Sequence, residues 1–98
     1  MQIRVEKGPE TFGRLQTFSD QLYGGVHADK GLTDFYFGFS GAGDTCEISF
    51  EVLGAEKQIA FLKIVDQEFE IVGVEPTEGG EEFEEEAIDW WRTKEGQS

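Results

Sequence analysis

The sequence predicts a two-layer α+β fold, in which helices cover an antiparallel sheet of about four to five strands. Two observations support this prediction. Apolar and polar residues alternate through residues 35–40 and 46–52, with the turn-forming sequence Gly41-Ala42-Gly43-Asp44 between them, which is typical of a β-hairpin with one buried face. Apolar residues recur at helical spacing in residues 9–23 and again in residues 81–92, which predicts two amphipathic helices.

The N-terminal part of the chain predicts a strand followed by a helix. Ile3 and Val5 alternate with polar residues, and Gly8-Pro9 ends this run. Pro9 suits the first position of a helix, and Glu10 suits its first turn because the helix dipole favours an acid there. We expect the helix to reach Tyr23, to end at Gly24-Gly25, and to pack one face on the sheet, made by Phe12, Leu15, Phe18 and Leu22. Residues 24–34 predict a loop.

The hairpin predicts a sheet with one apolar and one polar face. The apolar set comprises Phe35, Phe37 and Phe39 on the first strand and Cys46, Ile48, Phe50 and Val52 on the second. The opposite face would carry Tyr36 and the acids Glu47 and Glu51, so we interpret it as a secondary acidic surface that water contacts.

Residues 55–67 leave two alternatives open. Their Ala, Glu, Lys, Gln and Leu content favours a helix, which would give a ferredoxin-like βαββαβ order followed by the C-terminal helix. No N-cap residue precedes Ala55 and no glycine follows Gln67, whereas Ile59, Phe61, Ile64 and Val65 suit a strand. We therefore prefer a β-α-β-β-β-β-α meander with a final strand at 69–74.

Length and composition predict one acidic domain. The chain has 98 residues and a net charge of −13, so we expect a single domain over residues 1–98 with a frayed tail at 96–98. Such charge repels nucleic acid and anionic membranes and attracts basic surfaces. Cys46 is the sole cysteine and the first ten residues lack the apolar core of a signal peptide, so we expect a cytoplasmic protein.

The stretch from Glu78 to Arg92 contains both tryptophans and the densest negative charge. Residues 78–98 hold eight acids and two bases, a net charge of −6. On a helix, the acids would form a ridge opposite an apolar arc that includes both tryptophans, of which one would anchor the helix and the other would lie at the arc's edge. The candidate partner-binding residues are Glu81, Glu82, Glu85, Glu86, Asp89, Trp90 and Trp91.

The residues that usually carry catalysis or bind metals are few. His27 is the only histidine and has no second ligand at suitable spacing, and Cys46 is expected to be a buried thiol. Glycine-rich loops that bind phosphate precede the N-terminus of a helix. No helix is expected after Gly41-x-Gly43, so we interpret it as a hairpin turn. We therefore expect no catalytic residues, metal site or cofactor.

The leading hypothesis is a non-catalytic inhibitor that imitates the charge of nucleic acid. Its ridge of carboxylates would block a basic, nucleic-acid-binding surface of a partner protein. In size and charge, the chain is similar to small acidic counter-defence proteins of phages and mobile elements, including anti-restriction and anti-CRISPR proteins. The alternatives are a small-ligand or regulatory domain with a pocket between the first helix and the sheet, and a subunit of a larger assembly whose acids serve only solubility.

Overall fold

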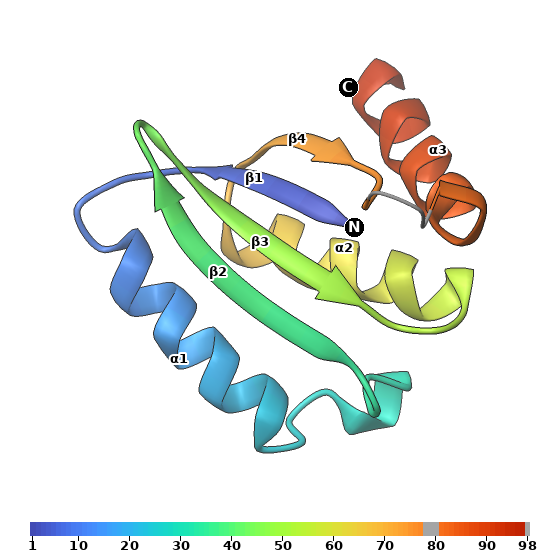
Figure 1. Ribbon diagram of the computed structural model, residues 1–98, viewed down its shortest axis with the longest axis horizontal. Helices are drawn as coiled ribbons and strands as arrows, with labels where there is room; N and C mark the ends of the chain where they lie inside the picture. Colours follow the sequence, from blue (N-terminus) through green and yellow to red (C-terminus); the bar gives the residue numbers. More distant parts are fainter. Residues whose placement is uncertain (78–80, 98) are drawn as a thin grey trace.

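The computed structural model describes residues 1–77 and 81–97, without the side chains of residues 42, 81–83 and 95–97. In chain order, the elements are β1 (Gln2–Glu6), α1 (Thr11–Tyr23), the 3₁₀ helix η1 (Ala28–Lys30), β2 (Tyr36–Ala42), β3 (Thr45–Glu51), α2 (Ala55–Glu68), β4 (Ile71–Glu75) and α3 (Glu81–Gln97) (Figure 1). The predicted α+β class is confirmed. Among the described residues, no helix combines the length and the apolar character needed to cross a membrane.

The four strands form one antiparallel sheet in the order β2-β3-β1-β4. The two central strands, β1 and β3, are each connected to an edge strand through a helix. Combined with the βαββαβ order of the elements, this is the ferredoxin-like arrangement that the sequence left as its alternative. The C-terminal helix α3 follows the sixth element of that unit.

The prediction of a strand within residues 55–67 is wrong, because Ala55–Glu68 form helix α2. Gly54 precedes the helix with a φ of 110°, a conformation that glycine adopts more readily than other residues. Because the N-cap is glycine, the missing side-chain cap costs only about a few tenths of a kcal/mol. Burial of Phe61, Leu62 and Val65 on one side of the helix contributes about 1.5–3 kcal/mol for each side chain, so packing outweighs the missing cap.

Helices α1 and α2 contact the same face of the sheet. Phe18 of α1 lies edge-on to Phe37 of β2, with ring centroids 5.8 Å apart, and it also contacts Phe61 of α2 at 6.0 Å. Phe61 in turn stacks on Phe50 of β3, with centroids 3.6 Å apart and planes 7° apart. The core therefore lies between this sheet face and the two helices.

The beginning of α1 differs from the prediction. The helix begins at Thr11, and Glu10 is its N-cap without a side-chain hydrogen bond. The backbone N–H of Gly8 donates to Oγ1 of Thr11 at 2.7 Å, and Thr11 is buried. Phe12, expected on the buried face, is instead 45% exposed and packs against Phe39. The first buried residue of α1 is therefore Thr11 and not Phe12, and the two side chains point about 100° apart around the helix axis.

Candidate functional site

The candidate site lies on α3, which packs along α2 beside the edge of the sheet formed by β4 (Figure 1). Ala87, Ile88 and Trp91 are buried in the same hydrophobic cluster as Phe61 and Val65 of α2. Helix α3 begins at Glu81 and extends to Gln97, so it is longer than expected and includes two of the three tail residues predicted to fray; Ser98 lies outside the described residues. The docked apolar side holds the opposite side of the helix in one orientation.

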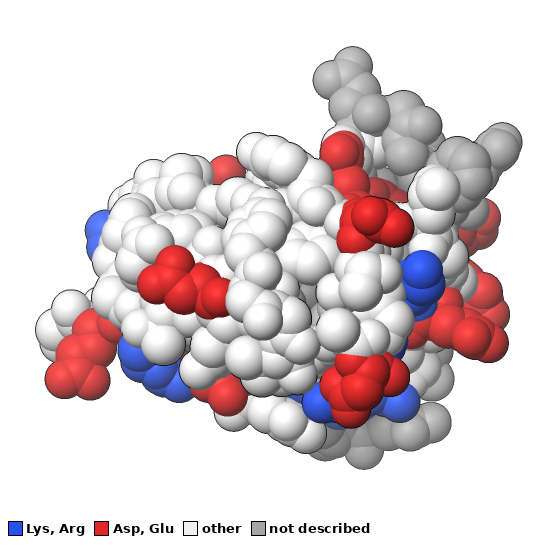
Figure 2. Space-filling view, turned by 90° about the horizontal axis from the view of Figure 1, so that it is seen from below, with Lys and Arg blue, Asp and Glu red and all other residues white. Residues whose placement is uncertain are grey.

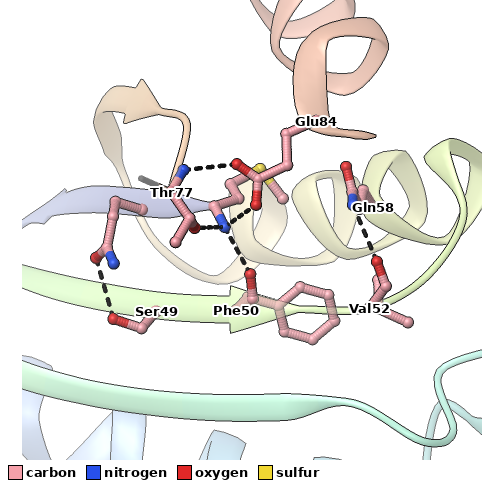
Figure 3. Close-up of polar contacts among 8 residues, drawn as sticks. Ser49, Phe50, Val52, Gln58, Thr77 and Glu84 are labelled. Atoms are coloured by element: carbon pink, nitrogen blue, oxygen red, sulfur yellow. Dashed lines mark hydrogen bonds and ion pairs between the residues drawn. The ribbon is translucent and has the colours of Figure 1, made fainter. Parts of the chain in front are cut away.

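A buried carboxylate attaches the first turn of α3 to the rest of the fold. Glu84 is 4% exposed and forms an ion pair with the amino group of Met1. Its other oxygen accepts a hydrogen bond from the backbone N–H of Thr77 at 2.7 Å (Figure 3). The Met1 amino group also donates to Oγ1 of Thr77 and, at 2.8 Å, to the carbonyl oxygen of Phe50. Each charge in this buried pair therefore has additional hydrogen-bond partners.

Glu84 was not among the predicted site residues. It lies three, four and seven positions before Ala87, Ile88 and Trp91, which is the spacing of a single helix face. This spacing is the sequence signal that places Glu84 on the same side of the helix as the buried residues. Its role depends on the Met1 amino group, which lies 83 residues away in the sequence.

The structure describes three of the five acidic side chains of the predicted ridge. Glu85, Glu86 and Asp89 are exposed on α3. Glu81 and Glu82 belong to the first turn of the helix, but their side chains lie outside the described residues. Glu85 and Asp89 are four residues apart, so their like charges repel by a few tenths of a kcal/mol, about 0.2–0.5. The surface therefore carries closely spaced charge despite a small local cost.

The two tryptophans have different environments. Trp91 is 8% exposed and anchors α3 in the core, so its ring is not available to a partner. Trp90 is partly buried at the edge of the cluster. The Nζ atoms of Lys63 and Lys94 lie 5.6 and 5.5 Å from the Trp90 ring, and Lys94 also pairs with Asp66 of α2. Trp90 therefore borders two lysines as well as the acidic ridge.

The secondary acidic surface lies on the sheet face opposite α1 and α2. Tyr36, Glu47 and Glu51 are all exposed there. Arg4, the cross-strand neighbour of Glu47, instead bonds to Glu75 at 2.9 Å. A different face, shown in Figure 2, carries its acidic side chains in separate groups with neutral surface between them. The negative charge there does not form one continuous field.

The described residues hold no group of three or more His, Cys, Asp or Glu side chains placed to bind a metal ion. Cys46 is a buried free thiol. His27 is partly buried, packs 6.3 Å from the Phe18 ring, and has a buried Nδ1 without a partner. Phe18 and Phe37 occupy the space where a ligand pocket was considered. An open groove of about 500 Å³ lies instead between α1 and Glu68 at the end of α2.

Comparisons with models of protein families, with curated proteins and with solved structures found no match.

Proposed function

We propose that the protein is a non-catalytic acidic binding module, whose α3 ridge blocks a basic, nucleic-acid-binding surface of a partner protein. The observation that supports the proposal most strongly is the pairing of two sides on one helix. Glu85, Glu86 and Asp89 are exposed, while the other side of the helix is held by Trp91 in the core and by the buried Glu84. A fixed row of carboxylates binds with a smaller loss of conformational entropy than a flexible acidic tail.

Charge complementarity defines the expected partner. The net charge of −13 favours encounter with a positively charged protein and disfavours binding to nucleic acid itself. A partner surface that normally contacts phosphates would present Arg and Lys side chains to the ridge. The acidic counter-defence proteins that the chain resembles in size and charge would act in this way. A cytoplasmic location, expected from the single cysteine, belongs to the same proposal.

A pull-down from lysate at two salt concentrations, read by mass spectrometry, tests the proposal. We expect a basic nucleic-acid-processing protein at about 0.05 M salt and its loss at about 0.5 M, because salt screens exposed charges. The key variant is Glu85→Gln, Glu86→Gln and Asp89→Asn combined. The matched control neutralises three exposed acids elsewhere, Glu10→Gln, Asp20→Asn and Glu68→Gln.

Recovery of the partner with the control but not with the α3 variant supports the ridge as the binding surface. Equal losses with both variants would show that only the overall charge matters. Recovery of no basic partner at low salt would reject the proposal. Light scattering on the purified protein separates these outcomes from self-association into a larger assembly.

A further inference from the structure

The outer edge of β2 presents backbone groups in a known direction. In an antiparallel pair, residues alternate between those whose N–H and C=O groups face the partner strand and those whose groups face away. The N–H and C=O of Phe50 bond to Met1, on the β1 side. Phe37, which lies opposite Phe50, must therefore direct its backbone groups outward. By the same alternation, the groups of Phe39 and Gly41 also face outward.

One of these outward positions is already occupied. The hydroxyl of Tyr23, at the end of α1, donates to the carbonyl oxygen of Phe37 and accepts from its N–H, both at 3.2 Å. Within the described part of the chain, the outward groups of Phe39 and Gly41 have no comparable partner. The uncapped part of the edge therefore extends from Phe39 towards the hairpin turn.

The surroundings of this edge differ on its two sides. On the α1 side, Phe12 is 45% exposed and its ring lies against Phe39, with centroids 5.5 Å apart. A Cβ atom on Gly41 would approach Cε2 of Phe12 to 3.1 Å, so the glycine lets this ring lie close to the strand. The Nζ atom of Lys7 lies 5.9 Å from the centroid of the Phe12 ring. An apolar side chain placed beside β2 on this side would cover the part of the ring that Lys7 leaves exposed.

On the open side of the sheet, an acidic side chain lies across from the edge strand. Glu47 lies opposite Ser40 of β2 and next to Arg4 of β1. Since Arg4 pairs with Glu75 instead, Glu47 has no ion-pair partner among the described residues. Ser40 is small, so a Lys or Arg side chain from outside β2 could extend across it to the carboxylate.

We propose that the β2 edge from Phe39 to Gly41 is a docking site for an extended segment of a partner protein, in which apolar and basic residues alternate. The segment adds to the sheet as a further strand. Its apolar side chains cover Phe12, and its basic side chains face Glu47. A second copy of this chain is the less suitable occupant, because each copy carries a net charge of −13. This site is separate from the α3 ridge and does not depend on it.

A binding measurement with a seven-residue peptide of alternating valine and lysine, blocked at both ends, tests the proposal. We expect NMR amide shifts centred on Phe39 and Gly41. Two N-methylated peptides supply matched controls of equal charge, one methylated at the valine amides and the other at the lysine amides. Because N–H directions alternate along a strand, one set faces β2 and the other faces water. We expect one methylated peptide to bind at least tenfold more weakly than the other.

Variants then test the two sides of the edge. Phe12→Ala and Glu47→Gln should each weaken peptide binding several-fold, whereas the combined α3 variant, Glu85→Gln, Glu86→Gln and Asp89→Asn, should retain the shifts at β2. Equal binding of the two methylated peptides, shifts confined to α3, or a concentration-dependent dimer with no peptide effect would each overturn the proposal. Failure here leaves the pull-down result with the α3 variant unaffected, so the two proposals can fail separately.

Discussion

Glu84 forms a buried ion pair with the amino group of Met1, so the first turn of α3 is attached to the start of β1. The pair also accounts for the position of the acidic ridge. Glu85 and Glu86, the next residues on the helix, are exposed. The buried side chain of Glu84 therefore fixes the direction in which Glu85 and Glu86 point from the helix.

Replacement of Glu84 by alanine should destabilise the protein by about 3–5 kcal/mol, because it leaves the Met1 amino group buried without its counter-charge. Glu84→Gln should cost less, since its amide oxygen can still accept from the Thr77 N–H. Glu85→Ala is the control on the exposed side and should change stability by no more than about 0.5 kcal/mol. Urea unfolding measures all three variants. Equal stabilities of the two alanine variants would contradict the assignment.

The two tryptophans should respond differently to substitution. Trp91→Ala removes a core side chain and should cost about 3–5 kcal/mol. Trp90→Ala removes a partly buried ring and its contacts with Lys63 and Lys94, for which about 1 kcal/mol is expected. Fluorescence of the single-tryptophan variants supplies a second readout, because the emission of Trp91 should lie at shorter wavelength than that of Trp90. The reverse order would place the anchor at Trp90.

Two glycines should respond to alanine in opposite directions. Gly13 lies inside α1, and a Cβ atom there would meet nothing within 4 Å, so Gly13→Ala should stabilise the protein by about 0.4–1 kcal/mol. Gly54 has a φ of 110° before α2, where a side chain causes backbone strain, and Gly54→Ala should cost about 1–3 kcal/mol. Thermal unfolding of both variants checks the signs. If Gly54→Ala stabilised the protein, the backbone before α2 would have adopted another conformation without strain, which would contradict this prediction.

The pair Glu6 and Glu70 should make stability depend on pH. Glu6 raises the pKa of Glu70 above the ordinary 4.5, first through a hydrogen bond between the side chains and then through like-charge repulsion. Between pH 4.5 and the raised pKa of Glu70, the folded state therefore holds a proton that the unfolded state has released. This contribution to stability is complete below pH 4.5 and is lost as the pH rises through the raised pKa of Glu70.

Glu70→Gln removes this titration. Relative to the wild type, the variant should gain stability between pH 4 and pH 7, as urea unfolding at the two pH values would show. Glu68→Gln removes one exposed charge two residues away, at the end of α2, and serves as the control. NMR titration of the Glu70 carboxyl measures the direction of the shift directly, and a value at or below 4.5 would contradict the pairing with Glu6.

Much of the fold could be predicted because local patterns and tertiary contacts agree. The alternation in residues 35–40 and 46–52 gave the hairpin, and the spacing of Leu15, Phe18 and Leu22 gave the buried side of α1. Residues 55–67 could not be assigned in the same way. Their apolar residues suit a strand locally, whereas burial of Phe61, Leu62 and Val65 in the hydrophobic core favours the helix.

By itself, the sequence determined the α+β class, the strong negative charge and the amphipathic character of the last helix, because these depend on composition and on residue spacing. Only the tertiary structure decided the strand order, the outward direction of the β2 edge and the difference between Trp90 and Trp91. It also separated Glu84 from the surface acids beside it. These features depend on contacts between residues far apart in the chain, such as Met1 with Glu84 and Tyr23 with Phe37, and short-range patterns do not record such contacts.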